Sequence, residues 1–145
     1  MVFVGIGQRT TLAGAAWPMQ LVPDYEFVPI NLRGMHDGED VLHLDCSFLP
    51  VGENSTLFYP DGMSEVPASV SETCDLIEVT SDEQQRLGTN VLSLDPSTVA
   101  AQPTSTRINH GMRARGIDVI EVPYTKPAKT GGSLHCYTLP LHRAR

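Results

Sequence analysis

Two short stretches of the chain contain the residue types that can do chemistry. The first, residues 42–46, has the sequence Leu-His-Leu-Asp-Cys, and the second, residues 131–136, has the sequence Gly-Gly-Ser-Leu-His-Cys. An imidazole exchanges protons near neutral pH, and a thiolate is a strong nucleophile. A cysteine and a histidine beside a carboxylate suit attack on the carbon of a guanidinium cation. We therefore expect His43, Asp45 and Cys136 to meet in one pocket.

The elements that must position these residues are predicted to be strands. Alternating residue types from Val41 to about Pro50 predict a strand whose side chains point to opposite faces in turn. On this pattern one face carries His43, Asp45 and Ser47, and the apolar face carries Leu42, Leu44 and Cys46. The Gly131-Gly132 pair permits a tight turn and leaves room for a ligand. A last strand is predicted from Cys136 to Leu141.

Simpler interpretations exist for each residue alone. A single histidine in a strand is usually a hydrogen-bonded structural residue, and a single cysteine is usually a small buried apolar side chain. A zinc site is a further alternative, with the ligands His43, Cys46, His135 and Cys136. We set it aside because the first two are predicted on opposite faces of a strand and the last two are sequence neighbours, whereas zinc needs ligands that converge tetrahedrally.

Composition predicts a single domain over residues 1–145. The chain is 41% hydrophobic and 19% charged, as in ordinary globular proteins. A net charge of -7 disfavours nucleic acid as a partner and is compatible with a cationic small molecule. Three cysteines without CxxC spacing favour a reducing compartment, and with no basic leader or long apolar run we expect a cytoplasmic protein without membrane contact.

Short strands that alternate with helices predict the α/β class. The strands are expected at residues 2–6, 27–32, 56–59, 75–79, 90–94, 98–101 and 117–122, and the helices at 11–22, 64–73, 80–87 and 104–115. Residues 123–130 are expected to form a loop. Arg9 follows the end of the first strand, a position at which α/β proteins often bind ligands. The alternative for Arg9 is a solvated arginine or a surface ion pair.

Three motifs in this order resemble the guanidino-group-modifying superfamily of arginine deiminases, dimethylargininases and amidinotransferases. They are residues 4–10 (Val-Gly-Ile-Gly-Gln-Arg-Thr), 42–45 (Leu-His-Leu-Asp) and 131–141 (Gly-Gly-Ser-Leu-His-Cys-Tyr-Thr-Leu-Pro-Leu). Residues 90–92 and the helix that spans 107–116 also fit, so the resemblance covers nearly the whole chain. It implies a pentein-like α/β propeller of ββαβ-type modules. The chain would be its C-terminal part, with the N-terminal modules missing.

The resemblance also implies roles for the residues. Cys136 would be the nucleophile that forms a covalent amidino-cysteine intermediate, and His43 would protonate the departing amine and then activate water. Asp45 would bind guanidinium N–H groups, and Arg9 would bind the substrate carboxylate. No metal or organic cofactor is implied. The His-Leu-Asp form and the tail at 136–143 resemble deiminases, since dimethylargininases commonly replace that aspartate.

The expected function is hydrolysis of a C–N bond in arginine or a related guanidino compound. The alternatives are amidino transfer to an amine and a non-catalytic fragment that needs a partner chain, because an upstream acidic residue that the family uses is not found here. The expected partners are an arginine-like small molecule and, for assembly, a second copy or a completing chain. An open propeller would expose strand edges and apolar surface.

Overall fold

The computed structural model describes residues 1–141; His142 and Arg143, part of the deiminase-like tail, lie outside the described residues. The strands are β1 (Val2–Ile6), β2 (Phe27–Asn31), β3 (Phe48–Val51), β4 (Ser55–Phe58), β5 (Asp75–Glu78), β6 (Leu92–Asp95), β7 (Thr98–Ala101) and β8 (Asp118–Glu121). The helices are α1 (Leu12–Leu21), α2 (Ala68–Thr73), α3 (Ser81–Gln85), α4 (Thr106–Arg113) and α5 (Thr125–Ala128). The predicted α/β class is confirmed.

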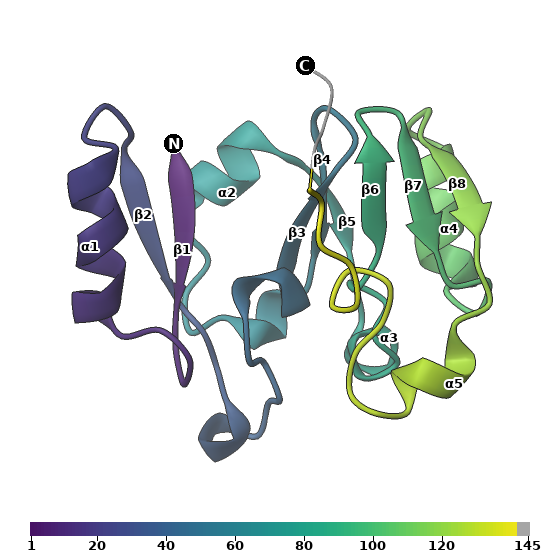
Figure 1. The fold of residues 1–145 in the computed structure, drawn as a ribbon, viewed down its shortest axis with the longest axis horizontal. Coiled ribbons are helices and arrows are strands. Elements are labelled where there is room, and N and C mark those ends of the chain that lie inside the picture. The colour runs from purple at the N-terminus through teal and green to yellow at the C-terminus, as the bar shows by residue number, and fades with distance from the viewer. Residues whose placement is uncertain (142–145) are drawn as a thin grey trace.

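The strands form three small sheets, which lie side by side in Figure 1. In the middle sheet, β3 and β4 form an antiparallel hairpin, and β5 pairs parallel to β4 after α2. The third sheet repeats this order, because β6 and β7 are antiparallel and β8 pairs parallel to β7 after α4. β1 and β2 pair in parallel around α1. The ββαβ unit therefore occurs twice, whereas the assignment to part of a propeller stays a prediction.

A shared apolar core joins the two ββαβ units. Leu57 of β4 and Val99 of β7 are fully buried in it, together with Ile108 and Met112 from one face of α4. Because α4 packs against both β8 and β5, this helix fixes one unit relative to the other. The arrangement holds the segments that precede β3 and β6 next to each other. None of the helices described for residues 1–141 has the length and apolar character needed to cross a membrane.

The segment that was expected to be a strand from Val41 is a 3-10 turn at Leu44–Cys46, and the strand β3 begins only at Phe48. The Cys46 amide donates to the His43 carbonyl at 3.1 Å, and the Ser47 amide donates to the Leu44 carbonyl at 2.9 Å. Leu44 packs closely on Gly5 of β1. A Cβ atom added at Gly5 would lie only 3.0 Å from the Cβ atom of Leu44. The predicted alternation of faces through this segment is therefore wrong.

Two further predictions near the C-terminus are wrong. Residues 136–141 form no strand, because turns occupy the segment: the Tyr137 amide donates to the Ser133 carbonyl and the Thr138 amide to the His135 carbonyl, each at 3.2 Å. The expected loop at 123–130 contains the short helix α5. The segment after α5 is held to the rest of the molecule partly by side chains, among them Gln102, which donates to the Ser133 hydroxyl at 2.9 Å.

An ion pair between Arg107 and Glu83 makes stability depend on pH. Arg107 donates to both carboxylate oxygens of Glu83, and this lowers the Glu83 pKa from 4.5 to about 2. A group whose pKa is lowered by folding stabilises the fold above its unfolded pKa, and the contribution is lost as the pH falls toward its folded pKa. The stabilising effect is thus complete above about pH 4.5 and disappears toward pH 2.

We expect Arg107→Ala to lower the urea midpoint of unfolding at pH 6 and to have a much smaller effect near pH 2.5. The matched control is Arg86→Ala, since Arg86 pairs with Asp82 at an exposed position where such pairs contribute little. An equal loss of stability at both pH values for Arg107→Ala would contradict the assignment.

Candidate functional site

The site is built where the segments that precede β3 and β6 meet. The turn at Leu44–Cys46 leads into β3, and Thr89 and Asn90 lead into β6. The Thr89 hydroxyl donates to the Cys46 carbonyl at 3.2 Å, which ties the two segments together. Equivalent positions in the two ββαβ units therefore supply adjacent walls of one site.

Asn90 holds Cys136 at this junction. Its side-chain Oδ1 accepts hydrogen bonds from the backbone amides of His135 and Cys136, at 2.9 and 3.2 Å. Because Oδ1 is committed to these donors, Nδ2 faces the thiol and donates to Cys136 Sγ at 2.7 Å. Asn90 is buried and Cys136 is exposed, so a buried amide fixes a thiol that solvent and small molecules can reach.

His135 connects this segment to Asp45. Its Nδ1 lies 3.0 Å from Asp45 Oδ2, and the Cys46 thiol donates to the other carboxylate oxygen, Oδ1, at 3.8 Å. The contact spans ninety positions in the sequence and brings the two chemistry-bearing stretches together. Asp45 is partly buried at this point, so its charge is less screened than that of a surface carboxylate.

His43 and Cys46 converge on Asp45. One potential ligand atom from each of the three residues lies within 4.8 Å of the other two. The 3-10 turn explains this, since it places on one side residues that a strand would send to opposite faces. The prediction that His43 and Cys46 lie on opposite faces of a strand is therefore wrong.

The two cysteines of the site differ in character. Burial raises the pKa of the Cys46 thiol, and the nearby charge of Asp45 and the thiol of Cys136 raise it further, against hydrogen bonds from the backbone. Cys46 therefore remains a thiol over a wider pH range than a free cysteine, and it is a poor nucleophile. Cys136 is exposed, and its sulfur accepts an N–H from Asn90, so it is the cysteine of the site that a small molecule can reach.

Arg9 is exposed in the loop that follows β1. The Gly7 amide donates to the Thr10 carbonyl at 3.0 Å and closes this loop. Gly7 and Thr10 line a cavity of about 230 Å³ together with His43. The structure thus brings His43, Asp45 and Cys136 into one region through the contacts above. It places the loop of Arg9, though not the Arg9 side chain itself, along the wall of the cavity beside His43.

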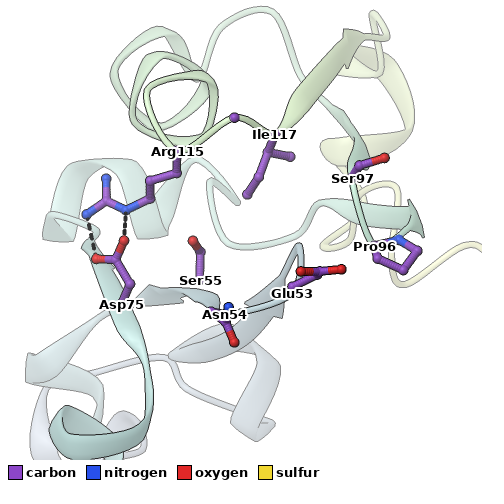
Figure 2. A pocket seen from close by; sticks show the side chains of 9 residues that line it. Glu53, Asn54, Ser55, Asp75, Pro96, Ser97, Arg115 and Ile117 are labelled. Carbon is purple, nitrogen blue, oxygen red and sulfur yellow. Dashed lines mark hydrogen bonds and ion pairs between the residues drawn. The ribbon is translucent and has the colours of Figure 1, made fainter.

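A second cavity, of about 520 Å³, lies at the opposite ends of the two sheets (Figure 2). Its walls include Glu53 from the β3–β4 hairpin loop, Ser97 from the β6–β7 loop, and Arg115. Arg115 donates to both oxygens of Asp75, at 2.7 and 2.9 Å, so its guanidinium is already paired. None of the sequence-predicted site residues lines this cavity.

From the sequence alone, Asn90 has no predicted role, and His135 is only a possible zinc ligand. Asn90 belongs to a stretch that fits the superfamily, and it is a polar residue directly before an apolar strand. This position is the only indication of a role for Asn90 in the sequence. Its hydrogen-bond partners are about 45 residues away along the chain, so no local pattern includes them.

Replacing Asn90 with alanine is expected to slow alkylation of Cys136 by iodoacetamide about tenfold at neutral pH. A hydrogen bond to a charged group contributes roughly 1.5–3 kcal/mol, and Nδ2 of Asn90 donates such a bond to the sulfur that attacks. The rate is followed by peptide mapping. Asn54→Ala, which removes the same kind of side chain at an exposed position on the wall of the other cavity, is the control and should react as the unaltered chain does.

Comparisons with known proteins agree on one group of enzymes. A family model described as N,N dimethylarginine dimethylhydrolase, eukaryotic, matches residues 1–143. The uncharacterized protein YkgA of Bacillus subtilis is 38% identical over 144 residues, which cover 99% of this chain and 49% of that protein. Mitochondrial glycine amidinotransferase of Xenopus tropicalis is 25% identical over 155 residues, which cover 98% of this chain and 36% of the enzyme. The chain thus spans about half or less of the length of these relatives.

Solved structures show the same fold. The substrate-bound N-terminal domain of ArgZ, an arginine dihydrolase from Cyanobacteria, matches with a TM-score of 0.78 and 23% identity over 94% of this chain and 50% of that domain. SxtG, an amidinotransferase from Microseira wollei, matches with a TM-score of 0.78 and 21% identity over 97% of this chain and 44% of that protein. At these identities the likeness shows the fold alone.

Proposed function

Since the chain belongs to the N,N dimethylarginine dimethylhydrolase family, and so to the guanidino-group-modifying superfamily that its motifs indicated, we propose that it contributes a cysteine-dependent site for hydrolysis of a guanidino C–N bond. The observation that supports this most directly is the set of hydrogen bonds from Asn90 that holds Cys136 exposed beside His135 and Asp45. The substrate class is arginine or an arginine methylated on its guanidinium.

The first half of the reaction forms a bond between sulfur and carbon. The Cys136 thiolate attacks the guanidinium carbon, and an S–C bond forms as the C–N bond to the departing amine breaks. His43 donates the proton that the amine needs in order to leave, as a general acid. The N–H of Asn90 stabilises the thiolate before attack and leaves the sulfur in place afterwards.

The second half returns the enzyme to its starting state. His43, now neutral, accepts a proton from water, and the oxygen attacks the amidino carbon. The C–S bond then breaks, so that the thiolate is restored and a ureido product departs. If an amine took the place of water, the same steps would give amidino transfer.

Asp45 and Arg9 bind the substrate in this proposal. Asp45 accepts guanidinium N–H groups through Oδ1, where a charge-assisted hydrogen bond takes the place of the long one from the Cys46 thiol at 3.8 Å. His135 also orients this carboxylate, so it acts as a positioning residue. Arg9 supplies a positive charge for the substrate carboxylate, from a loop whose neighbours line the cavity of His43.

A covalent-labelling experiment tests the proposal without requiring full turnover. The chain is incubated with a haloacetamidine, a guanidinium-like alkylating agent, with and without arginine or NG,NG-dimethylarginine as competitor. We expect the adduct on Cys136, with protection by the guanidino compounds. Labelling of Cys46 or Cys74 in preference to Cys136, or equal labelling in the presence of competitor, would refute the proposal. With turnover, ureido product supports hydrolysis, and an amidino-amine product indicates transfer.

A further inference from the structure

We propose that the cavity at the far ends of the middle and third sheets binds a small organic cation, a primary ammonium group on a short hydrocarbon chain, through Glu53 and Ser55. The cavity is here called the hairpin cavity, because the β3–β4 loop at Glu53 and the β6–β7 loop at Ser97 form two of its walls. The proposal does not rest on the proposed function, since none of the residues with a role there lines this cavity.

The hairpin cavity lies between the two ββαβ units and has the size of a small-molecule site. The β3–β4 loop packs against the other unit, because a Cβ atom added at Gly52 would lie 2.9 Å from Cδ1 of Ile117. The volume of about 520 Å³ is within the range of roughly 300–1,000 Å³ that is usual for ligand pockets. A water molecule takes about 30 Å³, so a single bare ion would leave most of the cavity unfilled.

Ser55 presents an unpaired hydroxyl to this cavity. Its backbone lies in the middle strand of its sheet, opposite Val51 of β3 and Asp75 of β5. Its side chain lines the cavity and points into it in Figure 2, and the residue is only 9% exposed. Within residues 1–141 the hydroxyl forms no hydrogen bond. A buried hydroxyl without a partner lowers the stability of a fold, so this one is suited to bond a ligand.

Two groups of donors on the cavity wall are already used. The amide and the hydroxyl of Ser97 both donate to Asp95 Oδ1, at 2.8 and 2.9 Å. Arg115 donates through Nε and Nη2 to Asp75, and through Nη1 to the Gly111 carbonyl at 3.2 Å. Acceptors therefore predominate among the groups left to a ligand, which favours a ligand that brings several N–H donors.

The charge of the hairpin cavity also favours a cation. The charged side chains that line it are Glu53, Asp75 and Arg115. Arg115 and Asp75 neutralise each other, whereas Glu53 forms no ion pair with any residue in the part of the chain that the structure describes. One net negative charge therefore remains. The Asn54 amide, which also lines the cavity, is neutral and leaves this charge unchanged.

An alkylammonium ion fits both the polar and the apolar walls. Its nitrogen would donate to the Glu53 carboxylate, a charge-assisted hydrogen bond, and to the Ser55 oxygen. Its hydrocarbon chain would lie against Ile117 and Pro96, which supply apolar surface. A calcium ion fits less well, because it takes six to eight oxygen ligands and usually several carboxylates, and Glu53 is the one unpaired carboxylate among the described residues that line the cavity.

Titration with n-butylamine at neutral pH, where the amine is protonated, tests the site by NMR. The chain is isotope-labelled at the δ1 methyl groups of isoleucine, and the Ile117 signal is identified by its loss in Ile117→Val. We expect this signal to shift and to saturate at millimolar amine, as for a ligand of so few atoms. The neutral n-butanol, which has the same hydrocarbon chain, should bind at least about tenfold more weakly.

Two variants identify the contacts. Glu53→Gln keeps the shape of the side chain and removes its charge, and it should weaken amine binding at least about tenfold. Ser55→Ala should weaken it about threefold to tenfold, because one hydrogen bond is lost. Glu26→Gln is the matched control, since Glu26 is an exposed glutamate beside β2 in another sheet, and this variant should bind as the unaltered chain does.

Several outcomes would overturn the proposal. Equal binding of the amine by Glu53→Gln and the unaltered chain would mean that the carboxylate is not a contact, and equal shifts with n-butanol would mean that the charge is not recognised. A shift that grows without saturation would be an effect of the solvent alone. Saturation by Ca²⁺ without any response to the amine would indicate a metal site instead. The other isoleucine signals report folding, and if Ser55→Ala is unfolded, the exposed Glu53→Gln still decides.

Discussion

A chain in which serine replaces Cys136 is expected to lose the haloacetamidine adduct and any turnover of guanidino substrate, by about a thousandfold or more. Serine keeps the size of the side chain and can still accept the N–H of Asn90. Its hydroxyl, however, is a far weaker acid than a thiol, so the ionised nucleophile is almost absent at neutral pH. Neither remaining cysteine compensates, because burial raises the pKa of Cys46, and Cys74 lies in another part of the molecule beside Thr73.

Intact-protein mass and ureido product formation measure this loss. Cys74→Ser serves as the control for removal of a thiol as such, and it should be labelled at the rate of the unaltered chain. A Cys136→Ser chain that still forms an adduct elsewhere, protected by arginine, would show that another residue is the nucleophile.

Replacing His43 with alanine is expected to lower turnover by about a hundredfold to ten-thousandfold, the usual contribution of a general acid–base residue. The effect on haloacetamidine labelling should be much smaller. A halide can leave without being protonated, whereas an amine must first accept a proton. Only the natural reaction therefore needs His43 as a general acid. The ratio of the two losses therefore distinguishes proton transfer from a structural effect of the mutation, which would lower both rates together.

His36→Ala is the matched control for His43, because His36 is an exposed histidine in another short turn. It should leave both rates unchanged. Equal losses of labelling and turnover in the His43 variant would contradict its role as the general acid.

Local patterns were sufficient to predict most of the strands. Short β-branched runs bounded by glycine, proline or polar residues gave β1, β4, β5, β7 and β8 nearly at their observed limits. The same rule failed at residues 42–47, where apolar and polar residues also alternate. There the contact of Leu44 with Gly5 of β1 favours a turn, and this contact joins segments about forty residues apart. A local sequence pattern cannot indicate a contact between such distant segments.

The sequence predicted only part of the candidate site, because some of its residues acquire their roles through contacts between distant segments. His43, Asp45 and Cys136 have distinctive residue types within recognisable motifs, whereas Asn90 and His135 acquire their roles from contacts across the fold. An asparagine before a strand is ordinary in sequence, and only the approach of the Cys136 segment gives its amide two backbone partners and a sulfur. The convergence of Cys46 on His43 likewise depends on the turn, which the sequence pattern concealed.

Cys136 belongs to a segment that side chains, notably Asn90 and Gln102, fasten to the sheets. We expect this attachment to open at a lower free energy than the cooperative core, so that the segment detaches while both sheets stay folded. Amide hydrogens at His135 and Cys136 should then exchange with solvent together, faster than those of β7, and a covalent amidino group on the sulfur should slow them. The time that Cys136 spends in its reactive position then depends on the local side-chain hydrogen bonds of this segment and not on the stability of the whole fold.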